Sequence, residues 1–305
     1  MLPSRSRSPR ASRFKIRCSV SVLHPQLVAD RQWLLVLRPQ ESSILGPQSP
    51  SQSKEQVDPI CLYPRNSFAI RVAINLTAML FPDLAGRVVA IRERIAAAVE
   101  RGGHGQQVSI VAVTKTHGPE AVTAAYAAGI QDVGENRVQE ALSKMPDVEV
   151  PVKWHLIGHL QRNKVKALES FDLFHALDSV RLADAIDRFG RDRGKPVDVL
   201  VQVNPAREET KGGFDLEEVS SVAERLAAMS GLRVTGAMTI ARLEADETEL
   251  RETFASVRET GKRLAAAGHP ATQLSMGMSG DFEIALEEGA TIVRLGTILF
   301  GAREQ

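Results

Sequence analysis

The chain has 305 residues, of which 43% are hydrophobic and 25% charged, and its formal net charge at pH 7 is +1. This balance does not support a nucleic-acid-binding protein, which would need a strongly basic surface, and no apolar run is long enough to span a membrane. Both cysteines, Cys18 and Cys61, lie near the N-terminus, so the rest of the chain has no disulfide framework and no cysteine metal site. This cysteine usage fits a reducing compartment, and we expect a cytoplasmic protein.

The N-terminal segment differs in composition from the rest of the chain. Residues 1–75 contain eleven Lys and Arg but four Asp and Glu, so they carry +7 and the remainder carries −6. Residues 1–17 are rich in Arg and Ser, which leaves targeting to an organelle open, and residues 40–58 are rich in Ser, Gln and Pro, as disordered segments are. We predict that residues 1–78 are a disordered or spurious extension, with Met79 as an alternative start. Residues 79–305 are then the single folded domain.

From residue 83 onward, amphipathic helices alternate with short apolar runs. Residues 83–101 have apolar positions at helical spacing and end at Gly102-Gly103. Eight runs with the composition of strands follow, at 108–115, 131–135, 153–160, 173–179, 197–204, 232–240, 272–278 and 291–301. Helical segments separate them, at 119–129, 136–145, 162–170, 180–194, 216–230, 247–268 and 280–289. Many of these segments end on glycine, a common stop signal for helices.

This alternation of strands and helices predicts a parallel sheet. Eight strands in about 200 residues favour a closed (β/α)8 barrel, the TIM-barrel fold. The alternative is a doubly wound open sheet, but no Gly-x-Gly-x-x-Gly turn follows the first strand. In a (β/α)8 barrel the active site lies at the C-terminal ends of the strands. The polar residues and glycines at those ends are therefore the candidate site.

The ends of the last two strands predict a phosphate site. In SMGMSGDFEIA, Ser279 and Gly280 come just before a helix, whose first N–H groups and dipole favour an anion. In RLGT, Gly296 and Thr297 lie beside them on the last predicted strand, and barrels of this fold often bind phosphate at the loops after strands seven and eight. The alternative is that Ser279 only caps the helix that begins near Asp281.

Lys115 ends the first strand, in VSIVAVTK, where a lysine amine is costly to bury unless it is paired or used chemically. A partly desolvated lysine has a lowered pKa and attacks carbonyl groups. An aldehyde that also carries a phosphate would satisfy both Lys115 and the phosphate loops, and pyridoxal phosphate (PLP) is such a molecule. Arg294 shares a strand face with Gly296 and would be the partner of the ring nitrogen. The alternative is a salt-bridged Lys115 with Glu135 as its partner.

A family resemblance rests on seven motifs, which are VAVTKTHGPEAV, DVGENRVQEAL, WHLIGHLQRNK, VLVQVN with ETKGG, GAMTI, LSMGMSGDFEIAL and VRLGTILFG. In their order and spacing, from about Leu84 to Gly301, the chain resembles the YggS/PROSC family of PLP-binding homeostasis proteins. The resemblance implies a single barrel similar to the N-terminal domain of bacterial alanine racemase. It also implies binding, buffering and transfer of PLP inside the cell.

The same resemblance implies roles for individual residues. Lys115 would hold PLP as a Schiff base, and Arg294 would face the pyridine nitrogen. The positions around the phosphate would be Ser279, Gly296 and Thr297. The remaining implied contacts are Asn136, Met238 and Met276, which would line the pocket, and Lys211, which would be a second contact for PLP.

Two features favour a carrier of PLP over a catalyst. Alanine racemase takes its second acid/base from a separate domain of the partner subunit, and here the chain ends at Gln305, four residues after Gly301. An arginine at the pyridine nitrogen keeps that nitrogen unprotonated, which weakens the ring as an electron sink. We expect a monomer without robust catalysis that passes PLP to PLP-dependent apoenzymes.

Two alternatives stay open. One is a PLP-dependent racemase-like enzyme, for which Tyr126, the one tyrosine in the predicted barrel, lies mid-helix and is badly placed to be the second base. The other is a sugar-phosphate barrel enzyme that uses Lys115, which predicts a pair of carboxylates near this lysine, and Glu135 alone gives thin support. His155 and His175 lie inside strands, and we expect them in the core rather than at a metal.

Overall fold

The computed structural model describes residues 80–206, 208 and 212–301. The predicted extension, residues 1–78, and the candidate residue Lys211 lie outside this part of the chain. Among the described helices, none has the length and apolar character that a membrane crossing requires.

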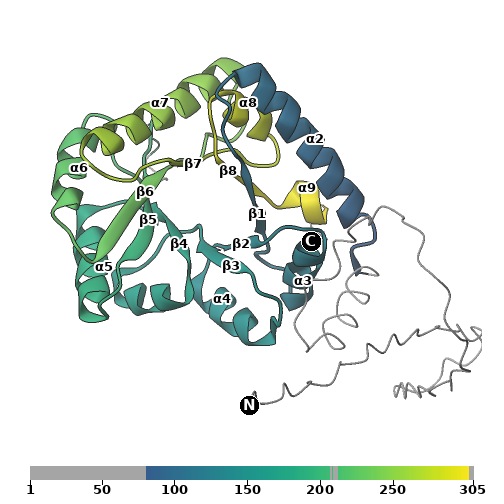
Figure 1. Ribbon diagram of the computed structural model, residues 1–305, viewed down its shortest axis with the longest axis horizontal. Coiled ribbons are helices and arrows are strands. Elements are labelled where there is room, and N and C mark those ends of the chain that lie inside the picture. The colour runs from purple at the N-terminus through teal and green to yellow at the C-terminus, as the bar shows by residue number, and fades with distance from the viewer. Residues whose placement is uncertain (1–79, 207, 209–211, 302–305) are drawn as a thin grey trace, which may run out of the picture. The chain divides into compact units, whose positions relative to one another are not determined.

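The described strands form one closed barrel in which each strand pairs with its neighbours in chain order (Figure 1). They are β1 Ser109–Val113, β2 Asp132–Glu135, β3 Lys153–Leu156, β4 Leu173–Leu177, β5 Val197–Gln202, β6 Leu232–Met238, β7 Gln273–Ser275 and β8 Ile292–Leu295. All pairs are parallel. The barrel closes where β8 pairs with β1, with Val111 opposite Arg294. The predicted (β/α)8 barrel is confirmed.

Helices cover the outside of the barrel (Figure 1). They are α2 Leu84–Gly102, α3 Pro119–Ala127, α4 Val138–Lys144, α5 Val180–Asp192, α6 Val219–Ala227, α7 Glu247–Ala266, α8 Phe282–Glu287 and α9 Thr297–Phe300, with 3-10 helices η1 Met145–Asp147 and η2 Arg162–Ser170. In α2 the buried residues recur every three or four positions, and the helix stops at Gly103, whose φ of 68° suits glycine. The caps of α5 and α7 are side chains, Ser179 and Asp246, that accept a backbone N–H.

One predicted strand is partly wrong. Residues 291–301 were expected as a single strand, but β8 ends at Leu295 and residues Thr297–Phe300 form the short helix α9. The ladder with β1 reaches only to the pair of Ala112 and Leu295, so the apolar residues that follow have no strand to pair with. A short apolar run does not by itself distinguish a strand from a buried helix.

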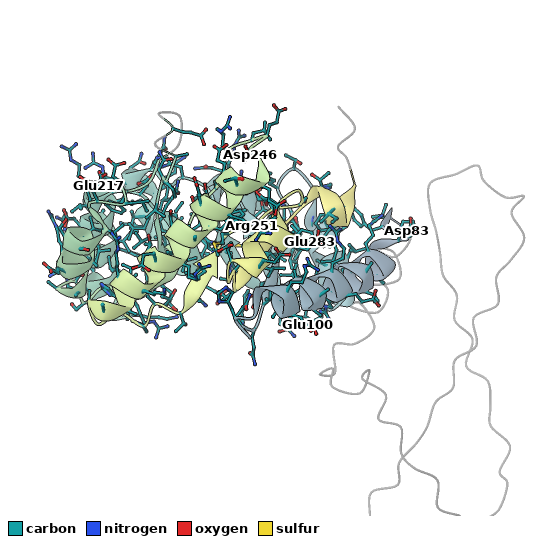
Figure 2. The ribbon with its side chains drawn as sticks, turned by 90° about the horizontal axis from the view of Figure 1, so that it is seen from above. Asp83, Glu100, Glu217, Asp246, Arg251 and Glu283 are labelled. Carbon is teal, nitrogen blue, oxygen red and sulfur yellow. The ribbon has the colours of Figure 1, made fainter. Side chains whose placement is uncertain are left out.

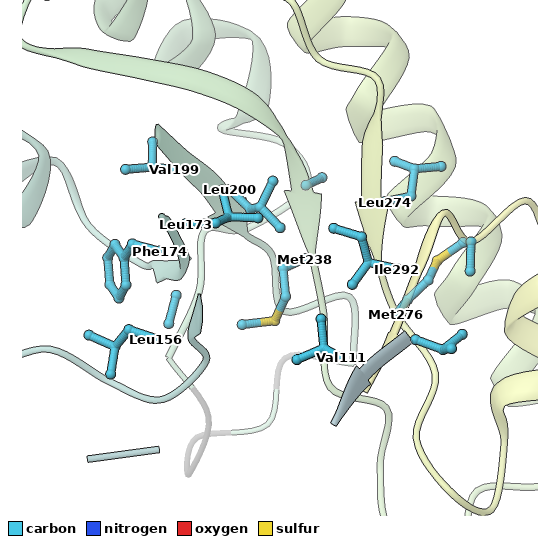
Figure 3. Close-up of a cluster of buried hydrophobic side chains, with 14 of the residues drawn as sticks. Val111, Leu156, Leu173, Phe174, Val199, Leu200, Met238, Leu274, Met276 and Ile292 are labelled. Carbon is cyan, nitrogen blue, oxygen red and sulfur yellow. The ribbon is translucent and has the colours of Figure 1, made fainter. Parts of the chain in front are cut away.

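Apolar side chains fill the barrel and the layer between strands and helices. Figure 3 shows Met238 and Met276 among them, near Val111 and Ile292. Both methionines are fully buried. Burying a side chain of this size contributes about 1.5–3 kcal/mol to stability. This cluster therefore stabilises the barrel, at whose strand ends the candidate site lies.

Ion pairs join three of the outer helices, α2, α7 and α8. Arg251 on α7 binds Glu287 on α8 at 2.7 Å, and Arg101 on α2 binds the same carboxylate at 2.6 Å. Arg94 on α2 binds Glu283 on α8 at 3.0 Å. Figure 2 shows Arg251 and Glu283 on these helices at the side of the barrel. The pairs hold α8 in place directly after the loop that carries Ser279.

Candidate functional site

Lys115 lies in the turn that follows β1, two residues beyond Val113. The hydroxyl of its neighbour Thr114 is buried and donates to Glu135 Oε1 at 2.7 Å. This contact fixes the backbone just before Lys115 against the end of β2. Lys115 itself is half-buried.

The turn is strained at the next residue. Thr116 has a φ of 69°, in the left-handed region that a β-branched residue rarely adopts. Its backbone N–H donates to Glu140 Oε1, on α4, and the N–H of His117 donates to the carbonyl of Thr114 at 3.1 Å. Strain of this kind persists only where the surroundings fix it, and it is concentrated at functional sites.

A buried ion pair supports the same turn from the α4 side. Lys144 Nζ lies 2.5 Å from Glu135 Oε1 and donates to the carbonyl of Thr114 at 2.9 Å. Burial raises the pKa of Glu135, while the hydrogen bonds from Lys144 and Thr114 oppose that rise. Glu135 therefore pairs with Lys144, not with Lys115 as in the alternative considered above. The carboxylates of Glu135 and Glu140 are bound on the α4 side, so Glu135 no longer supports a sugar-phosphate enzyme.

Arg294, on β8, is buried with its guanidinium inside the barrel. Its Nη1–H donates to Ser275 Oγ at 2.6 Å, and its Nη2–H donates to the carbonyl of Thr239 at 2.7 Å. Its Nε–H donates to no acceptor among the described residues. Burial lowers the pKa of Arg294 to about 10, with the Asp281 carboxylate opposing the change, so the guanidinium stays charged at neutral pH.

The loops after β7 and β8 lie together. Ser279 Oγ accepts a hydrogen bond from the backbone N–H of Ile298, in α9, at 3.3 Å. The alternative that Ser279 merely caps α8 is wrong, because Asp281 holds the cap position of that helix. The N–H groups of Ser279, Gly280 and Thr297 donate no hydrogen bond within the described part of the chain. Convergent N–H donors of this kind suit a phosphate.

Glycines shape two of these strand ends. Gly277 has a φ of 93°, and a Cβ there would lie 2.8 Å from Cβ of Ala285, so a side chain would displace the loop before Ser279. Asn136 follows β2, and its carbonyl oxygen would lie 2.3 Å from a Cβ on Gly158. Only glycine at position 158 lets the loops after β2 and β3 approach so closely.

The remaining candidates stay predictions. Met238 and Met276 are fully buried and pack within the core, as Figure 3 shows, so contact of either with a ligand is not settled by their position. Asn136 is half-buried at the expected strand end. His155 and His175 lie in the core, as expected.

Comparison with known proteins agrees with this geometry. The family model described as alanine racemase, N-terminal domain, matches residues 87–304. The pyridoxal phosphate homeostasis protein of Aquifex aeolicus (strain VF5) is 41% identical over 222 residues, which cover 72% of this chain and 97% of that protein. The chain belongs to the pyridoxal phosphate homeostasis protein family, within the alanine racemase N-terminal domain fold.

Other members of this family agree. The pyridoxal phosphate homeostasis protein of Pseudomonas aeruginosa is 37% identical over 224 residues, covering 72% of this chain and 96% of that protein. The structure of PipY from Synechococcus elongatus PCC7942 with PLP bound superposes with a TM-score of 0.64 at 34% identity, covering 72% of this chain and all of that one. The family resemblance inferred from the motifs is confirmed.

Four residues at this site were not identified from the sequence, namely Ser275, Thr239 as an acceptor, Glu140 and Lys144. A signal existed for Ser275, because a polar residue within an apolar strand run needs a buried partner. Glu140 and Lys144 lie on α4 with the spacing of ordinary surface charges. Their role depends on how α4 packs against the turn after β1, which no local pattern reveals.

Proposed function

We propose that this chain binds PLP at the C-terminal end of its barrel and acts as a carrier in intracellular PLP homeostasis, without robust catalysis. The observation that carries the proposal is the Arg294 guanidinium, buried and charged, with an Nε–H that has no acceptor among the described residues. A donor on an otherwise buried guanidinium that has no such acceptor suits a ligand that accepts its hydrogen bond. The pyridine nitrogen of PLP is such an acceptor, and PLP is bound in the structure of the relative PipY.

The other residues of the site fit the rest of the molecule. Lys115 lies directly beyond β1, the strand paired with the one that carries Arg294, and supplies the amine that forms a Schiff base with an aldehyde. The N–H groups of Ser279, Gly280 and Thr297, which have no acceptor among the described residues, suit the phosphate. The residues present thus match the ring nitrogen, the aldehyde and the phosphate of one molecule.

The same residues favour holding PLP over turning over an amino acid. A charged arginine donates to the ring nitrogen and leaves it unprotonated, so bound PLP supplies only a weak electron sink. Tyr126, the tyrosine considered as a second base, lies on α3 on the outside of the barrel. The relatives at 37% and 41% identity bear the name of homeostasis proteins, which agrees with a carrier.

A titration with PLP tests the proposal. We expect the wild type and the control Lys166→Ala, an exposed lysine on η2, to develop a visible absorption band that saturates with PLP. Lys115→Ala should give no such band. The loaded protein should also restore activity to a PLP-dependent apoenzyme. Turnover of an amino acid above about 1 s⁻¹, the lower end for enzymes, would contradict the carrier assignment.

A further inference from the structure

Arg294 is one end of a chain of hydrogen bonds that runs through the barrel. Its Nη1–H donates to Ser275 Oγ, which lies 2.9 Å from Nδ1 of His175. Nε2 of His175 lies 2.9 Å from Nδ1 of His155. Nε2 of His155 lies 3.1 Å from Oδ1 of Asp132, at the start of β2. The chain therefore links the candidate ring-nitrogen site to the opposite end of the barrel.

These side chains are deeply buried. His175 and Ser275 have no exposed surface, and the side chain of Asp132, 22% exposed, is the most exposed member of the chain. Strands β4 and β7 are not neighbours in the barrel, so the contact of His175 with Ser275 spans its interior. A polar chain in an apolar core is costly unless every member has a partner. Here each inner member, Ser275, His175 and His155, has one on both sides.

The carboxylate of Asp132 fixes the direction of the whole chain. An ionised carboxylate only accepts hydrogen bonds, so Nε2 of His155 must carry the proton. If this is the one proton on the ring, Nδ1 of His155 accepts, which requires His175 to carry its proton on Nε2. Nδ1 of His175 in turn accepts from the Ser275 hydroxyl, whose oxygen is left to accept from Arg294.

The opposite direction leaves a group unsatisfied. If His175 carried its proton on Nδ1, Ser275 Oγ would accept from both His175 and Arg294, and its own buried proton would have no acceptor in the chain. Such an orphaned donor is destabilising. Burial, with His155 and Arg294 nearby, lowers the pKa of His175 well below its usual value, so this ring stays neutral and keeps one proton.

We propose that this chain positions the Arg294 guanidinium for the ring nitrogen of PLP, and that Asp132 sets its direction from the far end of the barrel. The inference rests on the proposed function, because the ligand that Arg294 serves is PLP. Asp132, His155 and His175 form no hydrogen bond with Arg294. They lie too deep in the barrel to contact the ligand. They are positioning residues that act through Ser275.

The first test needs no ligand. Long-range ¹H–¹⁵N spectra of the protein, labelled with ¹⁵N-histidine and free of PLP, report which ring nitrogen carries the proton. We expect the Nε2–H tautomer for both His155 and His175. Asp132→Leu should weaken that preference at His175, which Asp132 does not touch, and Asp132→Asn, which keeps an acceptor oxygen, should restore it.

The second test measures PLP affinity in the same variants. Asp132→Leu and Ser275→Ala should bind PLP roughly 3- to 10-fold more weakly, the effect of about one hydrogen bond. The matched control is Asp198→Leu, since Asp198 lies near the start of β5 and pairs with Arg233 outside the chain. It should leave both the His175 tautomer and the PLP affinity unchanged. If Asp132→Leu fails to fold, the PLP affinity of Ser275→Ala tests the proposal on its own.

The outcomes separate the two proposals. A wild-type protein that forms no visible band with PLP would contradict the proposed function itself. A wild type that binds PLP, with variants at Asp132 and Ser275 that bind it equally well, would overturn the positioning chain alone. An Nδ1–H tautomer at His175 in the wild type would overturn it as well.

Discussion

At the scale of single residues, the site combines strain with buried charge. Thr116 is held in a left-handed conformation beside Lys115, and its N–H is bound by Glu140. Its side chain is exposed, so no packing compensates for the strain. The conformation persists because α4 holds the backbone on one side and β1 on the other.

This strain leads to a stability prediction. Thr116→Gly should relieve about 1–3 kcal/mol of backbone strain while losing about 0.5–1 kcal/mol to the greater freedom of glycine in the unfolded chain. We expect a net gain of roughly 1 kcal/mol, measured by urea unfolding. Thr116→Ala, which keeps a Cβ at the same φ, is the control and should show no gain. A glycine variant no more stable than the alanine variant would show that the turn is unstrained.

Sequence reasoning at this scale identified Lys115 because it ends an apolar strand, and Arg294 because it shares a strand face with Gly296. The partners of Arg294 were harder to find. Ser275 and the carbonyl of Thr239 come from β7 and β6, and only the closed barrel brings them to one guanidinium. Lys144 was missed for the same reason, because its contacts with Glu135 and with the carbonyl of Thr114 form only when α4 packs against the turn after β1.

At the scale of elements, the ion pairs on α8 fix the helix that follows the candidate phosphate loop. Glu287 accepts hydrogen bonds from Arg251 and Arg101, and these, in that order, hold the pKa of Glu287 below its usual value. A carboxyl with a lowered pKa stabilises the fold above its unfolded-state pKa of about 4.3. That contribution is lost as the pH falls through the lowered pKa of the folded state.

Glu287→Gln should therefore cost roughly 1 kcal/mol at pH 7, a modest value because both arginines are partly exposed. Urea unfolding of the wild type and the variant should show this difference shrinking as the pH falls from 5 toward the lowered pKa. The matched control is Glu100→Gln, an exposed residue on α2 (Figure 2), which should change little at any pH. A difference independent of pH would mean that Glu287 acts through packing and not through its charge.

Helices and strands were assigned correctly from the sequence where regular apolar spacing extends over several turns. The assignment failed where the apolar run is short. The helices α2 and α7 have several turns of regular apolar spacing, and both were predicted. The error at Thr297–Phe300 came from one apolar run that the sequence gives no means to divide. It is the register of β8 with β1 that ends the strand at Leu295.

At the scale of the whole molecule, the closed barrel brings the two decisive residues together. β1 and β8 lie at opposite ends of the folded sequence, yet they are paired. This pairing places Lys115, just beyond β1, next to the strand that carries Arg294. The count of strands predicted this closure, and the motifs predicted the family. The hydrogen-bond chain from Asp132 to Arg294 was not predicted, because it depends on which side chains meet inside the barrel.

The most direct test of the account is the site of covalent attachment. The protein is loaded with PLP, reduced with borohydride and digested, and the modified peptide is identified by mass spectrometry. We predict one label per chain, on Lys115, and none on Lys115→Ala. A label on another lysine, such as the neighbouring Lys144, or no label on a protein that is folded and saturated with PLP, would contradict the assignment of this barrel as a PLP carrier that uses Lys115.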